Sequence, residues 1–313
     1  MDLDVVFIGT AGSAPSARRS LPATLIRRGG DRLLFDCGEG TQRQLLRSVG
    51  LIELEDVFIT HFHADHFLGL PGMLKTFGLR GRETPLTVHG PAGLRRLFKA
   101  LLPVVGRSTF PLELVELEPN DEIERDGYRI ASFGVRHRGA ALGYALVEAD
   151  RPGRFDEARA RALGVDPGPD FGRLQRGEPV GDVRPDQVLG DGRRGRTVVL
   201  SGDTAPCDMT RAVAHGADLL VHEATFLHED GARARETAHT TAREAAEIAA
   251  GAEVGLLALT HVSPRYPGGA LRDEAREVFP RTIVPRDLDR VLIPFPERGE
   301  PVHERAGDWL KHA

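Results

Sequence analysis

The stretch "VFITHFHADHFLGL", residues 57–70, places three histidines and an aspartate within six positions. His61 and His63 are two residues apart, so in an extended loop both side chains project to the same side. Asp65 and His66 follow where the chain turns into a helix, and we expect them to point at a second position beside the first. Imidazole nitrogens and carboxylate oxygens are the ligands that zinc prefers when no thiolate is offered. Four such side chains exceed the needs of one open tetrahedral site, so the stretch predicts two metal ions.

Three further ionisable residues follow apolar strands elsewhere in the chain. His137 follows "YRIASFGV", Asp203 follows "VVLSG" and His261 follows "LLALT". An ionisable residue just beyond a buried strand suits a site built along one edge of a sheet. Alone, each such residue is more often a cap or a solvated loop end. Together with residues 61–66 they make five histidines and two aspartates, enough for two metal ions if Asp203 bridges them.

The surrounding sequence alternates strands with helices. Antiparallel strands are predicted over residues 112–149, where apolar and polar residues alternate. Helices are predicted over residues 91–106, with Pro91 in the first turn, and over residues 241–252, which begin with a Thr241-x-x-Glu244 capping box. Buried strands are predicted at residues 4–10, 54–60, 197–204, 218–226 and 255–263. This order predicts an α/β protein of two β/α halves packed face to face, a four-layer αββα sandwich.

Residues 150–196 differ in composition from the rest of the chain. They are rich in Gly, Pro, Asp and Arg and hold few large apolar residues. Such a segment cannot bury much of itself, so we expect it to project from the body as an inserted arm. Between residues 151 and 196, ten arginines face eight acids, which leaves a slight positive excess. The prediction is a single catalytic domain over residues 1–313 with an arm at 150–196.

Charge and cysteine content narrow the function classes. The net charge of −5 and the pI near 6.2 argue against a wholly basic surface, so nucleic acid would bind only through a local patch. Cys37 and Cys207 are the only cysteines and stand far apart, which fits a reducing compartment. The N-terminus lacks a positively charged region, and no apolar run approaches the roughly 18 residues of a membrane span. We therefore expect a cytoplasmic protein without a membrane partner.

The motif "THFHADH" resembles the H-x-H-x-D-H signature of the metallo-β-lactamase superfamily. Within that superfamily the chain resembles ribonuclease Z, the tRNA 3′-processing endonuclease, over nearly its whole length. The more specific stretches are "FDCGEGTQRQL", "ALGY", "HEATF" and "LTHVSPRY". The resemblance implies a metallo-β-lactamase sandwich whose projecting arm is a tRNA-binding exosite. Two features depart from the family pattern: Ser20 replaces an expected Asn, and the arm carries no lysine.

The same resemblance implies a set of site residues and their roles. One zinc ion is expected at His61, His63, His137 and Asp203, and the second at Asp65, His66, Asp203 and His261. Manganese, cobalt or iron could replace zinc at such nitrogen and oxygen ligands, and no organic cofactor is expected. Asp65 is the expected proton acceptor. His239, just before a helix, is the candidate proton donor, oriented by Glu223; from the residues alone, a solvated pre-helix histidine and a strand-end charge are equally good interpretations.

The implied activity is removal of the 3′ trailer from precursor tRNA, leaving a tRNA 3′-hydroxyl and a 5′-phosphorylated trailer. The resemblance also implies a homodimer in which the arm of one subunit serves the active site of its partner. A broader phosphodiesterase or 3′-exonuclease acting on RNA ends or small diesters is the alternative, since it needs the same metals. A third interpretation is an RNA- or protein-binding module whose site is catalytically inactive. The complete set of ligands argues against it.

Overall fold

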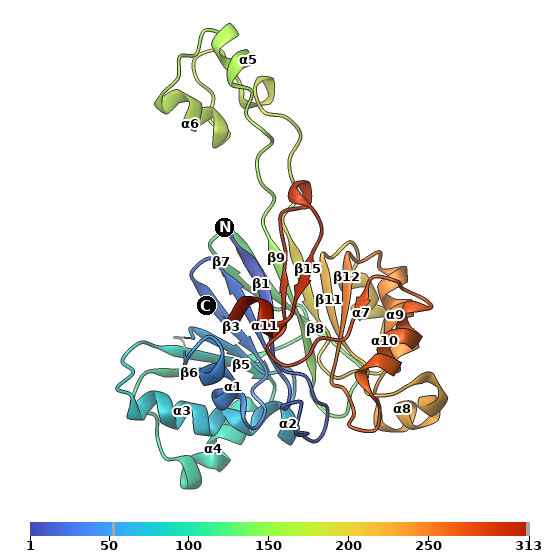
Figure 1. The fold of residues 1–313 in the computed structure, drawn as a ribbon. Helices are drawn as coiled ribbons and strands as arrows, with labels where there is room; N and C mark the ends of the chain where they lie inside the picture. The colour runs from blue at the N-terminus through green and yellow to red at the C-terminus, as the bar shows by residue number, and fades with distance from the viewer. Residues whose placement is uncertain (52–53, 311–313) are drawn as a thin grey trace.

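Two mixed β-sheets packed face to face form the centre of the molecule, which we describe from a computed structural model covering residues 1–51 and 54–310 (Figure 1). The first sheet has the order β15-β14-β1-β2-β3-β4-β5-β6 and the second the order β13-β12-β11-β10-β9-β8-β7. Helices cover the outer face of each sheet, so the predicted four-layer αββα sandwich is confirmed. The predicted domain of residues 1–313 includes residues 52–53 and 311–313, which lie outside the described residues.

The first sheet and its helices come mainly from the N-terminal half. Its strands are β1 (Leu3–Gly9), β2 (Ala23–Arg28), β3 (Asp31–Phe35), β4 (Asp56–Phe58), β5 (Leu86–Pro91), β6 (Leu112–Leu117), β14 (Arg290–Leu292) and β15 (Val302–Glu304). Its covering helices are α1 (Thr41–Arg47), α2 (Ala64–Phe67), α3 (Gly69–Leu79), α4 (Leu94–Val105) and α11 (Ala306–Trp309). Apolar side chains of these helices and of the outer sheet face form one buried cluster.

The second sheet comes from the middle and the C-terminal part of the chain, from residue 122 to residue 283. Its strands are β7 (Glu122–Arg125), β8 (Tyr128–Gly134), β9 (Leu142–Glu148), β10 (Thr197–Leu200), β11 (Leu219–Glu223), β12 (Leu256–Thr260) and β13 (Thr282–Ile283). Its helices are α7 (Asp208–Val213), α8 (Gly231–Thr237), α9 (Ala242–Gly251) and α10 (Gly268–Arg276). Phe7 and Phe58 of the first sheet meet Tyr144 and Leu200 of the second in the core between the sheets. Because protein interiors are close-packed, this buried interface fixes the position of one sheet relative to the other.

Two local predictions were wrong and one was right. Strand β6 pairs in parallel with β5 in the first sheet, because α4 carries the chain across before it begins. Of the strands between residues 112 and 149, β7, β8 and β9 pair antiparallel with one another as predicted. Pro91 ends β5, where it pairs with Leu117, and the helix begins at Leu94 after Gly93 has adopted φ +103°. The capping box of Thr241 and Glu244 is present at the start of α9. No helix in the described part of the chain is long and apolar enough to cross a bilayer.

The segment between β9 and β10 projects from the sandwich as an arm (Figure 1). It contains α5 (Glu157–Ala162), α6 (Pro169–Gln175) and the short 3-10 helix η1 (Pro185–Gln187). The expectation that the arm buries little of itself is wrong at its tip, where a small core forms from Ala160, Val165, Leu174, Val183 and Val188. The few apolar residues suffice because they gather between the two short helices.

The base of the arm is tied to the body by ion pairs. Arg151 places two guanidinium nitrogens 2.9 Å from the two carboxylate oxygens of Glu297, and Arg193 adds a contact of 3.2 Å. Arg196 is fully buried and donates to Glu148 at the end of β9, with two contacts of 2.7 Å. The guanidinium groups of Arg151 and Arg193 lower the pKa of Glu297 to about 2, with Arg151 contributing most. Glu297 lies between β14 and β15, so the C-terminal hairpin supports the arm.

Candidate metal centre

All seven predicted ligands meet along one edge of the sandwich. His61 and His63 lie in the loop after β4, and Asp65 and His66 lie in α2, the short helix that follows. His137 lies between β8 and β9, Asp203 follows β10 and His261 follows β12. The two sheets therefore each contribute side chains from their strand ends to a common centre.

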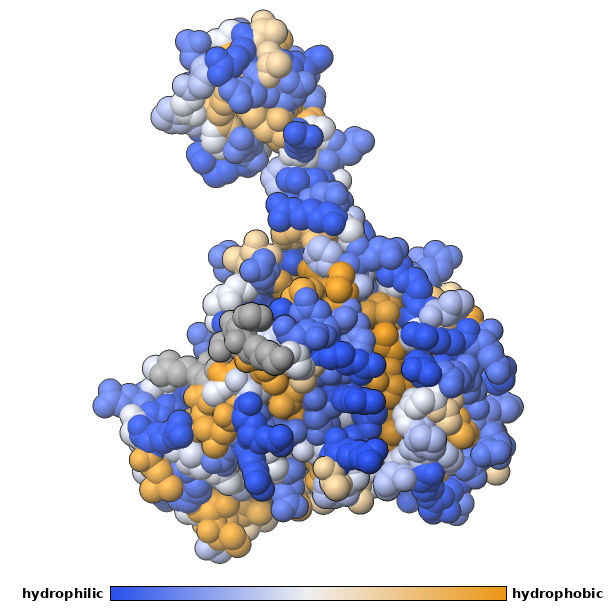
Figure 2. All heavy atoms as spheres, viewed as in Figure 1, coloured by the Kyte–Doolittle hydropathy of each residue, from blue (hydrophilic) through white to orange (hydrophobic). Residues whose placement is uncertain are grey.

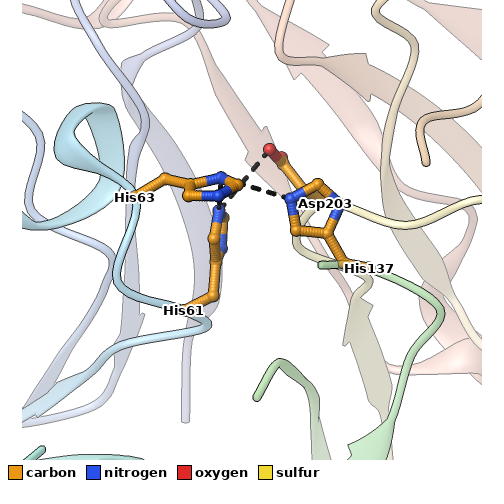
Figure 3. Close-up of side chains that lie close together, drawn as sticks. All are labelled: His61, His63, His137 and Asp203. Atoms are coloured by element: carbon orange, nitrogen blue, oxygen red, sulfur yellow. Dashed lines mark hydrogen bonds and ion pairs between the residues drawn. The ribbon is translucent and has the colours of Figure 1, made fainter. Parts of the chain in front are cut away.

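One group of ligand atoms comes from His61, His63, His137 and Asp203 (Figure 3). Nδ1 of His63 lies 3.0 Å from Nε2 of His61 and 3.2 Å from Nε2 of His137. Oδ2 of Asp203 lies 3.7 Å from Nε2 of His61. One ligand atom of each of the four residues lies within 4.8 Å of the others, an arrangement that suits a metal ion.

A second group comes from Asp65, His66 and His261. Oδ2 of Asp65 lies 3.2 Å from Nε2 of His261 and 3.6 Å from Nε2 of His66. Oδ2 of Asp203 lies 3.2 Å from Nε2 of His261 and 3.4 Å from Nε2 of His66. The carboxylate of Asp203 thus lies between the two groups and contacts members of both.

A buried carboxylate that the sequence reasoning overlooked, Asp36, orients two histidines of the first sheet. Nδ1 of His66 donates to Asp36 Oδ2 at 2.7 Å. The Thr60 hydroxyl lies 2.9 Å from the same oxygen and 3.0 Å from Nδ1 of His61, so it donates to the carboxylate and accepts from the imidazole. Asp36 directly follows β3, so the strand-end criterion that found Asp203 would also have found it.

Glu223 orients two histidines of the second sheet in the same way. Nδ1 of His239 lies 2.8 Å from Oε1 of Glu223. The Thr225 hydroxyl lies 2.6 Å from Oε2 of Glu223 and accepts from Nδ1 of His261 at 2.8 Å. The structure therefore brings His239 and Glu223 together and makes Glu223 a fully buried group. Glu223 does stand at the end of β11, but the interpretation of His239 as a solvated pre-helix residue is wrong, because its side chain is buried.

The donor set fits a pair of metal ions. The Nδ1 atom is hydrogen-bonded to the hydroxyl or carboxylate described above in three of the histidines, His61, His66 and His261. Nδ1 of His137 donates to the carbonyl of Ala238 at 2.9 Å. Metal-bound histidines typically donate their other ring N–H in this way, which leaves the remaining nitrogen free to ligate. Nε2 of His66 is buried and, within the described residues, makes no hydrogen bond. A metal ion would satisfy it.

The pKa values of the two carboxylates in the centre depend on the histidines beside them. Burial disfavours ionisation of Asp203, but the neighbouring His261 and His66 outweigh it and hold the pKa of Asp203 well below its usual range. The pKa of Asp65 is lowered in the same sense, chiefly by the hydrogen bond from His261, and the backbone N–H of Ser13 also donates to Asp65 at 2.8 Å. Both carboxylates are therefore ionised at neutral pH, as metal ligation requires.

His239 lies next to the proposed ligands without belonging to either main group. Its ring stacks on that of His261 with centroids 5.2 Å apart, and its Nδ1 lies 3.9 Å from Asp203 Oδ2. Burial works against its protonation, but the charge of Glu223 outweighs burial and raises the pKa of His239 to about 9. Its Nε2 makes no hydrogen bond within residues 1–51 and 54–310, so this nitrogen is free to donate. His239 also forms a third potential ligand set with Asp203 and His261.

Comparison with known proteins shows first the superfamily and then the family of this chain. The family model of the metallo-beta-lactamase superfamily matches residues 19–261, a range that contains all seven predicted ligands. A ribonuclease Z of Gemmatimonas aurantiaca is 50% identical over 307 residues, which cover 95% of this chain and 98% of the relative. A ribonuclease Z of Methanosarcina acetivorans is 44% identical, covering 94% of this chain and 99% of the relative.

The crystal structure of the short form of human tRNase Z matches this fold with a TM-score of 0.69 and 26% sequence identity, covering 93% of this chain and 99% of that one. At these identities and coverages, the chain belongs to the ribonuclease Z family. It is accordingly an enzyme of the endoribonuclease class, and the resemblance inferred from its motifs is confirmed.

Proposed function

We propose that this protein is a zinc-dependent endoribonuclease that removes the 3′ trailer from precursor tRNA, leaving a tRNA 3′-hydroxyl and a 5′-phosphorylated trailer. One observation carries the proposal: two groups of histidine and aspartate ligand atoms share the carboxylate of Asp203 in a chain of the ribonuclease Z family. One zinc ion would be held by His61, His63, His137 and Asp203, and the other by Asp65, His66, Asp203 and His261. Two bound metal ions supply an activated water and neutralise charge on the phosphate.

Asp65 and His239 handle the protons of the reaction in this proposal. Asp65 accepts the proton of the attacking water, and its depressed pKa keeps it ionised before the step. The water oxygen forms a bond to phosphorus as the bond from phosphorus to the 3′-oxygen of the tRNA breaks. His239 donates its proton to that leaving oxygen from Nε2, while Glu223 holds Nδ1 and stabilises the protonated ring. The phosphate stays on the 5′ end of the trailer.

The arm is proposed to bind the tRNA body in a homodimer. Strand β9 begins beside the centre, where the Leu142 N–H donates to the Thr60 carbonyl at 2.9 Å, and it ends at the base of the arm. The six steps between its first and last residues span about 20 Å at roughly 3.3 Å each, so the arm starts at the far end of the sandwich from its own site and points away (Figure 1). This placement favours service of a partner's site over service of its own.

The candidate dimer surface is an apolar face on the helices of the first sheet. Leu68, Leu79, Leu102 and Val104 are exposed there, at the ends of α2, α3 and α4. A hollow of about 310 Å³ between α3 and α4, lined largely by apolar side chains, lies beside them. Figure 2 shows hydrophobic surface gathered over these helices. An apolar face of this kind marks an association surface, and a second copy of the chain is the occupant we propose.

End-labelled precursor tRNA and bis-p-nitrophenyl phosphate, offered to the same metal-loaded protein, test the function. We expect one cut in the precursor, a tRNA 3′-hydroxyl, a 5′-phosphorylated trailer and about two metal ions per chain. Chelation should abolish both reactions without unfolding the core. Asp65→Ala should lose cleavage by orders of magnitude while tRNA binding persists.

Two outcomes would favour the alternative function. Stepwise shortening of the trailer would indicate a 3′-exonuclease, and hydrolysis of the small diester without any cut in the precursor would indicate a broader phosphodiesterase. Comparable turnover by Asp65→Ala and the parent would remove Asp65 from the proposed mechanism.

A further inference from the structure

The proposed proton donor, His239, lies directly beyond the C-terminus of α8. Two backbone hydrogen bonds close this helix: the Ala238 N–H donates to the Arg235 carbonyl at 3.3 Å, and the His239 N–H donates to the Ala234 carbonyl at 2.9 Å. Such a pair of bonds forms a Schellman motif, in which the residue after the helix is left-handed. Ala238 takes that position with φ +58°. The way in which α8 ends therefore places the backbone of His239.

This helix end is strained. The left-handed position of a Schellman motif usually holds glycine, because the Cβ of any other residue crowds the following carbonyl oxygen. Strained backbone persists only where its surroundings hold it, and here the carbonyl of Ala238 accepts from Nδ1 of His137 at 2.9 Å. The rings of His137 and His239 lie with their centroids 5.1 Å apart. One short segment, residues 236–239, thus orients a proposed zinc ligand and carries the proposed proton donor.

Arg138 supports this segment from the loop between β8 and β9. Its Nη2 donates to the carbonyl of Glu236 at 2.6 Å. Glu236 lies in the last turn of α8, where carbonyl groups lack partners within the helix and where an arginine also interacts favourably with the helix dipole. Because Arg138 directly follows His137, two consecutive side chains of one loop hold two carbonyls of the segment. The loop and the segment are joined at both points.

The hydrogen bond from Glu223 fixes one side of the His239 ring through Nδ1, whereas the proposed donor atom is Nε2. The direction of Nε2 therefore also depends on where the backbone of His239 lies. We propose that Arg138 is a positioning residue for proton transfer: it caps α8, keeps residues 236–239 in place and so directs Nε2 of His239 at the leaving oxygen. The inference rests on the proposed function and adds to it a residue that does not touch the reacting atoms.

A precursor tRNA with sulfur in place of the leaving 3′-oxygen separates proton donation from the rest of the reaction. Thiols ionise near about pH 8.5, so a thiolate departs without a proton donor, whereas the alkoxide of the normal precursor needs one. On the normal precursor, Arg138→Ala should lower kcat about tenfold, because a misplaced catalytic group loses much of its effect. On the sulfur precursor, kcat should stay close to that of the parent. His239→Ala should show the same pattern with a larger loss on the normal precursor, about 100-fold or more.

Two further variants make the test specific. Arg138→Lys keeps a cationic donor for the Glu236 carbonyl and should restore most of kcat on the normal precursor. Arg136→Ala is the matched control, because Arg136 is also exposed, lies two residues away and donates at 3.3 Å to the carbonyl of Pro206, outside the segment. This control should keep the parent's ratio of kcat on the two precursors.

Hydrogen exchange of the metal-free protein gives a readout that does not depend on activity. The amide of His239, which closes α8, should exchange faster in Arg138→Ala than in the parent or in Arg136→Ala. Unchanged exchange at this amide would overturn the proposal, because the segment would then be held without Arg138.

Four kinetic results would also overturn it. Equal losses of kcat on both precursors would mean that Arg138 acts through His137 or the fold, and a change in KM alone would mean that it contacts RNA. The same ratio of kcat in Arg138→Ala and Arg136→Ala, or a lysine variant no better than alanine, would remove the hydrogen bond to Glu236 from the mechanism. A parent that does not cut the normal precursor would instead refute the proposed function, and equal losses on both precursors by His239→Ala would refute the role of His239 as donor.

Discussion

Replacing Asp36 by Asn should weaken metal binding although Asp36 is not itself a proposed ligand. The carboxylate accepts from the Thr60 N–H at 2.8 Å through Oδ1 and from Nδ1 of His66 at 2.7 Å through Oδ2. An amide has only one oxygen, so one of these two donors must face an NH₂ group. If Nδ1 of His66 faces the NH₂ group, the proton of the ring shifts to Nε2, the atom that faces the centre. Nε2 then has no lone pair free to bind a metal ion. Asn suits this position sterically because Asp36 has φ +58°, a left-handed conformation that Asn tolerates.

The expected loss of metal affinity is 10–100-fold, about 1.4–2.7 kcal/mol, which is typical for removal of the outer partner of a ligating histidine. If the Thr60 N–H is left unpaired instead, the loss appears as about 1–3 kcal/mol of stability. Competition with a chelator measures the first quantity, and denaturant unfolding of the metal-free protein measures the second. Parent-like affinity together with parent-like stability would refute this account of Asp36.

The chain supplies a matched control in Asp56, at the start of β4. It is also a buried carboxylate paired with a histidine: Oδ1 lies 2.7 Å from Nε2 of His89, and Arg125 donates to Oδ2 at 2.9 Å. Burial disfavours its ionisation, but the hydrogen bonds from His89 and Arg125 outweigh burial and lower the pKa of Asp56. Asp56→Asn should reduce stability and leave metal affinity unchanged, because none of these residues is a proposed ligand or a partner of one.

Three further predictions follow from the arm, its base and Asp56. Replacing residues 150–196 with a short Gly/Ser linker should leave hydrolysis of a small diester nearly intact, while precursor tRNA cleavage falls through a raised KM; equal loss on both would make the arm structural. Glu297→Gln should raise the KM for precursor tRNA severalfold without affecting hydrolysis of the small diester, because the arm loses its ion pairs at the base. Glu300→Gln, whose partner is Arg281, is the control. An unchanged KM for Glu297→Gln would contradict the role of the base. The difference in unfolding free energy between the metal-free parent and metal-free Asp56→Asn should have its full value above about pH 4 and should shrink below it. The reason is that a carboxyl group whose pKa is lowered in the folded state loses its contribution to stability as it is protonated. A difference that widens at low pH would contradict the lowered pKa of Asp56.

The proposed ligands were readable from the sequence because each follows a buried strand and four of them share one short motif. Asp36 also follows a buried strand, but it was missed because its partner His66 lies 30 residues further along the chain, outside any local motif. Thr60 and Thr225 were missed for a related reason: a hydroxyl acquires its role only from the two groups that it joins, and those come from different strands.

Features assembled from distant segments were out of reach of sequence reasoning. The groove that Arg18, Arg265 and Arg286 help to line is built from four parts of the chain between residues 11 and 305, so no local stretch of sequence reveals it. The parallel placement of β6 depends on the crossover by α4, whereas alternation within the strand is the same for either direction. The core at the arm tip depends on two short helices meeting, which composition alone does not reveal.

The position of the arm in the topology has a consequence for how such an enzyme evolves. Strands β9 and β10 are antiparallel neighbours, with Leu146 opposite Val198, and a two-residue turn would suffice to join them. The arm occupies the place of that turn, so its length and sequence can change without altering the pairing of any strand or the position of any proposed ligand. Mutation can therefore alter the proposed RNA-binding segment while selection preserves the proposed metal centre, and recombination could exchange the arm as a unit between relatives.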